Sequence, residues 1–425
     1  MMSFNQENSN SKLFVNLPFI VKWLGISIVC SVLIGSASAG FLFALEWATN
    51  TRELHPTLLY FLPIVGFLIG CVYHYYGKAV EAGNNLLIET IHQPKGIIPW
   101  LMAPLVFVGT IMTHLFGGSA GREGTALQMA GSIADQLSKP FKLSTEERKL
   151  LIVAAVAGGF GSVFGTPLAG VVFGLEFYLI GRLRYNALLP AVFTAILSDY
   201  VTKLWNAHHT HYHVGAIPEI NPKLVIYVVL AAILFGFCAR LFSEMMKYLS
   251  TIFISKITYA PLRPFVGGTI VLVGIVLVGS TKYIGLGIPT IEASFYSSSA
   301  PYDFILKLLF TVLTLSAGYK GGEVTPLFFI GATLGSALSV FFSVPVGLFA
   351  GIGFVAVFAG ATNTPIACTL MAIELFGPEI GIYAAIACAI SYLISGHTSI
   401  YNKQIVGEPK HLNLSQDKGK KLTEL

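Results

Sequence analysis

Charged side chains are scarce in this sequence. Only 11% of its 425 residues are Asp, Glu, Lys or Arg, whereas 54% are hydrophobic and the mean hydropathy is +0.73. A soluble protein carries about a quarter charged residues. The shortage excludes an ordinary soluble domain and predicts a multi-pass protein of the cell membrane, with the lipid bilayer as its surroundings. The formal net charge of +5 reflects short basic segments and gives no indication of a nucleic-acid partner.

Motifs for disulfide, metal and catalytic chemistry are also missing. The five cysteines show no CxxC spacing and are predicted to be small core residues. Four histidines lie close together between His208 and His213, but no Asp or Glu stands among them and no HExxH motif occurs. We therefore expect no enzyme, no cofactor and no metal. We interpret the histidine segment as an exposed polar loop without a specific ligand. A transition-metal site is the alternative.

Long apolar runs and their interruptions predict the membrane architecture. A bilayer span needs about 20 apolar residues. Breaks rich in Gly and Pro occur at 137–140, 165–167, 321–326 and 364–365, and broken helices at membrane depth usually line a buried site. The runs that approach or exceed a span are Trp23–Leu45, Leu58–Tyr76, Leu150–Ile180 and Leu348–Phe376.

Basic residues predict the orientation. Lys12 and Lys22 precede the first run, and further Lys and Arg residues gather at 138–149 and in the tail, so all three segments should be cytoplasmic. The 206–222 loop has no Lys or Arg and should be external. The predicted order is a cytoplasmic segment 1–17, a membrane half 18–205, the external loop 206–222, a second membrane half 223–400 and a cytoplasmic tail 401–425.

A glycine-dense stretch contains the residue of most interest. Glycines from Gly117 to Gly121 break the preceding helix, and a new helix can start near Glu123. A helix start presents unpaired N–H groups and a partial positive charge, which attract anions. The carboxylate of Glu123 can compete there with a free anion, or take up a proton and leave. We interpret the neighbouring Arg122 as balancing charge or binding loop carbonyls.

A second helix start follows Gly83. Asn84 and Asn85 can cap it, because Asn is a strong N-cap residue. Their amides can also donate hydrogen bonds to a ligand. The sequence leaves open which of the two faces a site.

The sequence repeats itself. Glu123-Gly124-Thr125 recurs as Glu323-Val324-Thr325, 200 residues later, and Thr166-Pro167 recurs as Thr364-Pro365, 198 residues later. These repeats predict that the chain consists of two related halves. Paired interrupted segments in such halves indicate a transporter's binding site. A carboxylate at membrane depth is costly, so Glu323 is a second functional candidate.

Two other residues receive structural interpretations from their positions. Glu176 recurs as Glu374, again 198 residues later, and we interpret Glu176 as a structural carboxylate at the membrane interface. Tyr401 follows the last apolar run, where aromatic side chains commonly anchor a protein at that interface.

These motifs together resemble the CLC family of anion channels and anion/proton antiporters. Gly121–Thr125 is similar to the family's GREGP signature, with Thr in place of Pro, and Gly322–Pro326 is similar to GxFxP, with Val324 in place of Phe. Tyr401 is similar to the family's anion-coordinating tyrosine. Asn84 falls in the region of the GSGIP signature, whose serine and proline are missing here.

The departures resemble the fluoride/proton antiporter branch of the family. Phe177 stands where chloride/proton antiporters usually carry a second, internal glutamate. The resemblance implies a homodimer of all-α subunits, each with two inverted-repeat halves and its own pathway. It also implies a fluoride/proton antiporter in which Glu123 is the gating and proton-carrying carboxylate and Glu323 assists the coupling. A chloride/proton antiporter or a passive chloride channel is the alternative.

Helix starts and hydroxyls are predicted to supply the donors for a dehydrated anion. Fluoride is small and strongly hydrated, so it needs short, strong hydrogen bonds in place of water. The predicted anion-binding residues are Asn84, Gly124, Thr125, Val324, Thr325 and Tyr401.

Overall fold

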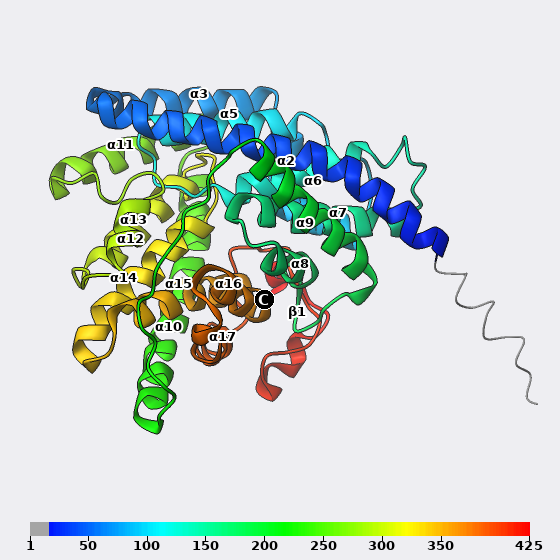
Figure 1. Ribbon diagram of the computed structural model, residues 1–425. Coiled ribbons are helices and arrows are strands. Elements are labelled where there is room, and N and C mark those ends of the chain that lie inside the picture. The colour runs from blue at the N-terminus through cyan, green and yellow to red at the C-terminus, as the bar shows by residue number, and fades with distance from the viewer. Residues whose placement is uncertain (1–16) are drawn as a thin grey trace, which may run out of the picture.

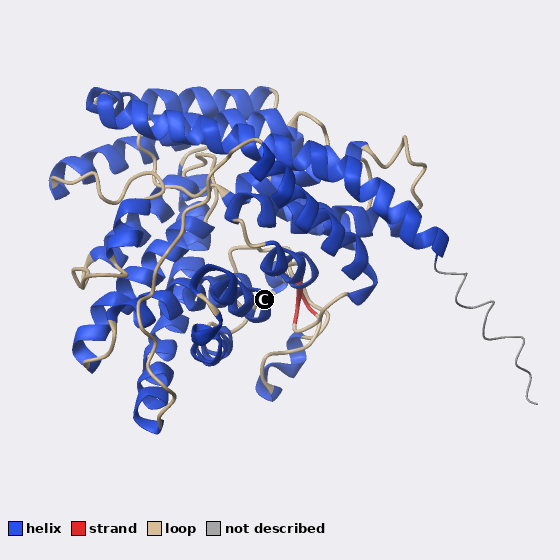
Figure 2. Ribbon diagram, viewed as in Figure 1, coloured by secondary structure: helices blue, strands red, loops and turns tan. Residues whose placement is uncertain are grey.

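Helices make up nearly all of the regular structure. The computed structural model describes residues 17–425, and Figure 1 shows them as an assembly of tilted and crossing helices. The strands that it contains, β1 (Leu179–Ile180) and β2 (Ile405–Val406), form one short parallel pair (Figure 2). The all-α class predicted from the sequence is therefore confirmed. The predicted segment 1–17, with Lys12, lies outside the described residues except for Leu17.

The 16 α-helices of residues 17–425 form two series of eight. Each series begins with its longest helix, of 38 residues in the first and 35 in the second. The first series is α2 (Leu17–Leu54), α3 (Leu62–Tyr75), α4 (Asn84–His92), α5 (Met102–Leu115), α6 (Glu123–Gln136), α7 (Thr145–Phe164), α8 (Pro167–Glu176) and α9 (Leu188–Leu204). The second is α10 (Pro222–Lys256), α11 (Leu262–Val278), α12 (Ile288–Ala293), α13 (Asp303–Ser316), α14 (Val324–Phe342), α15 (Val346–Thr362), α16 (Pro365–Phe376) and α17 (Gly381–Ile394). Short 3-10 turns are η1 (Pro56–Phe61), η2 (Lys78–Val80), η3 (Tyr185–Ala187), η4 (Pro378–Ile380), η5 (Leu412–Asp417) and η6 (Leu422–Glu424).

The predicted breaks separate helices in the structure. The break at 165–167 separates α7 from α8, and the break at 364–365 separates α15 from α16. In both places a proline is the first residue of the new helix, where its missing N–H costs nothing. The sequence reading overlooked α10 as a span because Arg240 and Glu244 interrupt its apolar run. Within residues 17–425, the segments long and apolar enough to cross a membrane are Leu17–Leu54, Pro56–Tyr75, Tyr185–Leu204, Pro222–Lys256 and Val324–Phe342.

Two carboxylates tie α8 and α16 together in opposite directions. Glu374, near the end of α16, accepts backbone N–H groups from the first turn of α8, with an N–O distance of 2.7 Å to Ala169. Glu176, at the end of α8, accepts the corresponding groups from α16, at 3.0 Å from Ala367. The two helices are therefore antiparallel. Since they hold the same place in their series, the halves are inverted relative to each other, as the family resemblance implies.

The same contacts correct the interpretation of Glu176. Its residue is only 5% exposed and its carboxylate is buried between the two halves, so it is a structural carboxylate of the protein interior and does not face water. A buried carboxylate needs hydrogen-bond donors, and the first turn of α16 supplies them.

Ion pairs connect the segments that were predicted to be cytoplasmic. Lys22 of α2 pairs with Glu147 at the start of α7. Arg184 pairs with Glu146 of the same turn, and the nearby Arg182 pairs with Glu408 of the tail, which links the tail to 138–149.

The loop 206–222 packs on α2 farther along that helix, where Ala207 shares a cluster with Ala39 and Leu42, and it lines one cavity together with Glu46. At 1.5 Å per residue, Lys22 and Glu46 lie roughly 36 Å apart along the helix, more than the thickness of a bilayer's apolar core. The basic segments and the loop therefore lie at opposite ends of α2.

Candidate anion and proton site

The starts of α6 and α14 meet back to back at two glycines. Gly121 and Gly322 form an antiparallel bridge in which each N–H donates to the other's carbonyl, with an N–O distance of 2.8 Å from Gly322 to Gly121. A Cβ atom on Gly322 would lie 2.6 Å from the backbone nitrogen of Gly124, so only glycine allows this approach. The bridge brings the repeated carboxylate motifs of the two halves to one place, as the paired breaks predicted.

Glu123 lies at this junction and is completely buried. Its carboxylate points away from its own helix toward the first turn of α14. One oxygen accepts the hydroxyl of Thr325 at 2.6 Å, and the other accepts the Thr325 backbone N–H at 3.0 Å. The Arg122 backbone N–H also donates, at 3.1 Å. The carboxylate oxygens thus occupy the place that a small free anion would take at a helix N-terminus.

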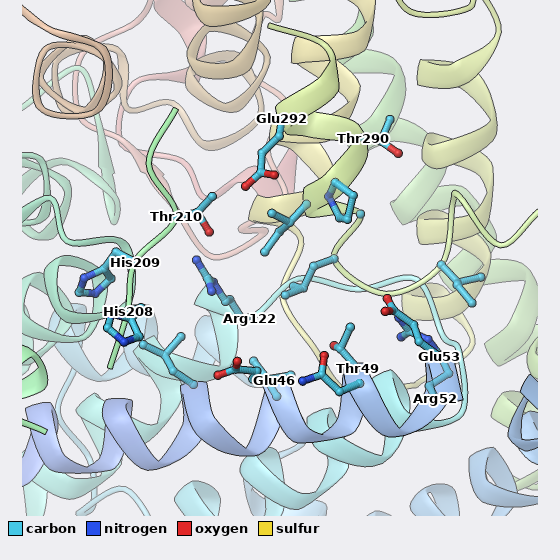
Figure 3. Close-up of a pocket in the computed structure, with 18 of the residues that line it drawn as sticks. Glu46, Thr49, Arg52, Glu53, Arg122, His208, His209, Thr210, Thr290 and Glu292 are labelled. Carbon is cyan, nitrogen blue, oxygen red and sulfur yellow. The ribbon is translucent and has the colours of Figure 1, made fainter. Parts of the chain in front are cut away.

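Arg122 balances part of this charge. Its Nε lies 3.4 Å from a carboxylate oxygen of Glu123, in agreement with the charge-balancing interpretation. The guanidinium extends from there into a cavity beside the site (Figure 3).

A second group of polar atoms gathers behind Gly124. A Cβ atom placed on Gly124 would lie 3.0 Å from the amide nitrogen of Asn84 and 3.4 Å from Oε2 of Glu323. That Glu323 oxygen and Oδ1 of Asn84 are both buried, and they have no hydrogen-bond partner in residues 17–425. The buried hydroxyl of Tyr401 is also without a partner among these residues. Buried polar atoms are nearly always paired in native structures, so this group is suited to a polar ligand.

The structure distinguishes Asn84 from Asn85. Asn84 faces Gly124, whereas Oδ1 of Asn85 accepts the backbone N–H of Lys403 at 3.1 Å. The expectation that an asparagine caps α4 is wrong. Gly83 occupies the N-cap with a φ of +57°, and Asn84 is already the first helical residue, so its amide stays available to the site.

The interpretation of Tyr401 as an interfacial anchor is also wrong. The residue is 1% exposed, and its ring packs edge-on against Phe177 with the ring centroids 6.0 Å apart. Phe177 therefore fills apolar space beside the tyrosine.

The remaining predicted residues occupy the first turns of the two helices. Val324 begins α14 and is fully buried. Thr125 lies in the first turn of α6, but its hydroxyl bonds to the hydroxyl of Thr110 on α5 at 2.6 Å. Within this structure the Thr125 hydroxyl therefore fixes α6 against α5, while the Thr325 hydroxyl faces the carboxylate.

Of three cavities lined by the 206–222 loop in the described part of the chain, two adjoin the site. A cavity of about 10 Å³, roughly the space of one water molecule, touches Glu123 and Thr325. A larger cavity of about 730 Å³ lies outside it, between the end of α2, the loop and the 281–292 segment (Figure 3). The sequence reading missed the aromatic walls of the small cavity, because Phe328 and Phe354 show no pattern that separates them from ordinary core residues. We call the larger cavity the vestibule.

Histidines of the loop line the vestibule, but their geometry is not that of a metal centre. His209 bonds through Nε2 to the carbonyl of Ser162 at 2.9 Å. Tyr212, from the same stretch, packs among aromatic rings with its centroid 5.4 Å from that of Phe354. No group of three or more His, Cys, Asp or Glu side chains in residues 17–425 is arranged to hold a metal ion.

This architecture defines a class: a membrane protein of two inverted halves whose helix starts converge on a buried, anion-like carboxylate. The profile of a family described as voltage gated chloride channel matches residues 65–396. The chain belongs to this CLC family.

Relatives and solved structures agree with this assignment. The chain is 53% identical over 401 residues to a chloride/fluoride channel protein of Pseudomonas syringae pv. tomato, and the match covers 93% of this chain and 89% of that protein. It is similar to the crystal structure of a CLC-type fluoride/proton antiporter, with 34% identity, a TM-score of 0.87, and 90% and 97% of the two chains covered. A slow cyanobacterial Cl⁻/H⁺ antiporter, at 20% identity and a TM-score of 0.76 over 93% and 97% of the chains, shares the fold.

Proposed function

We propose that this protein is a fluoride/proton antiporter of the cell membrane that uses the proton gradient to export fluoride. The observation that carries the proposal is the buried carboxylate of Glu123, held by Thr325 at the start of α14 as an anion would be held. One site that accepts either a carboxylate or a free anion couples the two ions, because the anion can enter only when the carboxylate leaves.

Protonation drives the exchange. When Glu123 binds a proton, it loses the charge that attracts it to the N–H groups of α14. Fluoride then takes the donors of Thr325, and the protonated side chain moves toward the polar group formed by Asn84, Glu323 and Tyr401. Glu323 lies beside this path and assists the coupling. The buried oxygens of this group supply hydrogen-bond acceptors for the proton of Glu123, and the Asn84 amide and Tyr401 hydroxyl supply donors for the anion.

Three features support fluoride over chloride. Thr125 replaces the proline of the family signature, an asparagine amide replaces the serine, and no second glutamate stands at Phe177. Both similar proteins described above, the chloride/fluoride channel protein and the CLC-type fluoride/proton antiporter, are associated with fluoride. A strongly hydrated ion needs charge-assisted and short hydrogen bonds to replace its water, which amide and hydroxyl donors provide.

A chloride/proton antiporter or a passive anion channel is the second candidate. It is favoured by the relative's name, which includes both chloride and the word channel. Flux measurements in proteoliposomes separate the candidates. A fluoride antiporter releases fluoride faster than chloride and moves protons in the direction opposite to fluoride. A channel moves no protons.

We also propose a homodimer with one pathway in each subunit, oriented with the basic segments in the cytoplasm. All of the site residues named above come from a single chain, so a subunit needs no partner to complete its site. The positive-inside rule supports the orientation.

The decisive experiment records fluoride efflux and pH together in proteoliposomes. With wild-type protein, protons should enter the liposomes as fluoride leaves them. Glu123→Gln should abolish this coupling. Glu379→Gln, a change at an exposed carboxylate, is the matched control and should leave coupling intact. Full coupling in the Glu123→Gln variant would refute the proposal.

A further inference from the structure

The vestibule brings the loop histidines next to the candidate site. Its lining includes His208, His209 and His211, whereas His213 of the same loop does not line it. In Figure 3, Glu292 and Glu46 lie on opposite walls, and the guanidinium of Arg122 lies between them. The loop thus provides proton-accepting side chains at the entrance of a cavity.

The vestibule continues to Glu123. Arg122, Thr210 and Ile288 line both the vestibule and the small cavity that touches Glu123. Exposure falls along this line, since His208 is exposed, Thr210 is partly buried and Glu123 is fully buried. The small cavity has room for about one water molecule, and Thr210 contributes a hydroxyl-bearing side chain to the lining of both cavities.

The vestibule cations have partners, while two of its carboxylates do not. Lys282 pairs with Asp303 at 2.6 Å, and Arg52 donates to the carbonyl of His114 at 2.8 Å. Glu46 and Glu292 are exposed and form no ion pair within residues 17–425. These two carboxylates are therefore free to exchange protons with water.

His209 is fixed in one orientation. Its Nε2 must carry a hydrogen to donate to the carbonyl of Ser162, so Nδ1 remains the nitrogen that can accept a proton. Burial lowers the pKa of His209, and the hydrogen bond to Ser162 opposes this shift. Other charged or titratable groups around the loop histidines are Glu46, Arg52, Glu53, Arg122, Asp199, Lys203, Lys282, Glu292 and Glu374.

We propose that His208, His209 and His211, with Glu46 and Glu292, form an external proton-collecting site that supplies Glu123 through Thr210. This inference rests on the proposed antiport function. An imidazolium N–H bond breaks, the proton passes along the Thr210 hydroxyl and one water, and an O–H bond forms at the Glu123 carboxylate. Imidazole suits this task because its ordinary titration lies between pH 5 and 8. In weakly buffered medium few other proton donors are present, so such groups increase the supply of protons to the vestibule.

The test uses intact cells, in which every copy has the same orientation. Cells are loaded with fluoride, and efflux into the medium is followed with a fluoride electrode. In weakly buffered medium near pH 7, the H208Q/H211Q double variant and the E46Q/E292Q double variant should lose fluoride severalfold more slowly than wild type. Adding imidazole to the medium should restore the rate, because a small mobile buffer replaces the missing groups.

Controls distinguish proton collection from structural damage. His213→Gln changes an exposed histidine outside the vestibule and should match wild type in weak buffer. Thr210→Val should slow efflux at all imidazole concentrations, and Thr210→Ser should restore it. The proposal would be overturned if both double variants released fluoride at the wild-type rate in weak buffer. It would also be overturned if they released fluoride slowly and added imidazole did not change that rate.

A separate readout keeps this inference apart from the antiport function. In proteoliposomes, the double variants should keep the wild-type ratio of protons to fluoride, because Glu123 is intact. An altered ratio would overturn the collecting role. If wild type itself moves no protons, the antiport function fails; if wild type is coupled and the vestibule variants are normal, only this inference fails.

Discussion

Thr325 donates two hydrogen bonds to the carboxylate of Glu123, across the boundary between the two halves. The backbone N–H and the hydroxyl lie 3.0 Å and 2.6 Å from different carboxylate oxygens. The N–H is one of the donors that every helix leaves unpaired in its first turn, and the hydroxyl adds a donor that valine would lack. Thr325 therefore contributes both a backbone N–H and a hydroxyl to the recognition of negative charge, in addition to the N–H and guanidinium of Arg122.

Thr325→Val should weaken anion binding while keeping the shape of the site. A hydrogen bond to a charged group contributes about 1.5–3 kcal/mol, and 1.4 kcal/mol is about tenfold in affinity. Since Glu123 competes for the same donor, the effect is best measured in a Glu123→Ala background. There, calorimetric titration should show fluoride binding at least about tenfold weaker with Thr325→Val. Thr325→Ser should bind normally.

The matched control for this prediction is Thr333→Val in the same helix. The Thr333 hydroxyl is buried but donates to the Phe329 carbonyl, far from the carboxylate. Thr333→Val should therefore leave fluoride binding unchanged. Equal binding by Thr325→Val and Thr333→Val would show that the Thr325 hydroxyl contributes nothing to anion recognition.

Gly124→Ala should block transport without unfolding the protein. The added Cβ would lie 3.0 Å from both the Asn84 amide nitrogen and the Gly322 Cα, which is closer than nearly all real contacts. The backbone of Gly124 is helical, so alanine is tolerated there locally. Fluoride efflux from proteoliposomes should fall to the level of empty liposomes. Gly40→Ala, where nothing lies within 4 Å of the new atom, should transport normally.

Local signals in the sequence predicted the helix starts but not every side-chain partner. Glycine clusters and prolines act on the backbone beside them, so the starts of α6 and α14 and the breaks before α8 and α16 were predictable. The cap of α4 was not, because Gly83 adopts a left-handed φ that removes Asn84 from the capping position. Thr125 was predicted to bind the anion, and its hydroxyl bonds to Thr110 on a neighbouring helix.

Contacts between distant segments explain the other differences. Tyr401 was placed at the membrane surface because it follows the last apolar run. It is buried because Gln404, three residues later, bonds to carbonyls of Phe177 and Thr362 and draws the chain inward. The vestibule could not be predicted either, since its walls come from α2, the 206–222 loop and the 281–292 segment, which no local pattern connects.

Glu176→Gln should reduce stability and leave proton coupling intact. Glutamine keeps an acceptor for the N–H groups of α16 but removes the charge that favours a helix N-terminus. The loss should be about 0.5–2 kcal/mol, the range for helix caps and charges at helix ends. Glu374→Gln should cost less because Glu374 is only partly buried. Thermal unfolding in detergent measures both. Loss of proton coupling in Glu176→Gln would instead identify Glu176 as a proton carrier.

Gln404→Met should lower both stability and fluoride transport. Gln404 is fully buried, and its amide donates to Thr362 at 2.8 Å while its oxygen accepts from Asn363 at 2.9 Å. Methionine fills similar space but leaves these buried groups unpaired, at a cost of about 1–3 kcal/mol each. Because the same segment carries Tyr401, the buried tyrosine hydroxyl should lose its position. The melting temperature and the rate of fluoride efflux should therefore fall together.

The control and a double variant separate these two effects of Gln404. Gln416→Met changes an exposed glutamine of the same tail and should alter neither quantity. If Gln404 acts on transport through Tyr401, adding Gln404→Met to Tyr401→Phe should slow efflux little beyond Tyr401→Phe alone, while the melting temperature still falls by the full amount. If the double variant instead slows efflux by the product of the two single-variant factors, Gln404 affects transport independently of the tyrosine hydroxyl. Independent sites contribute additively to the free energy, so their effects on the rate multiply.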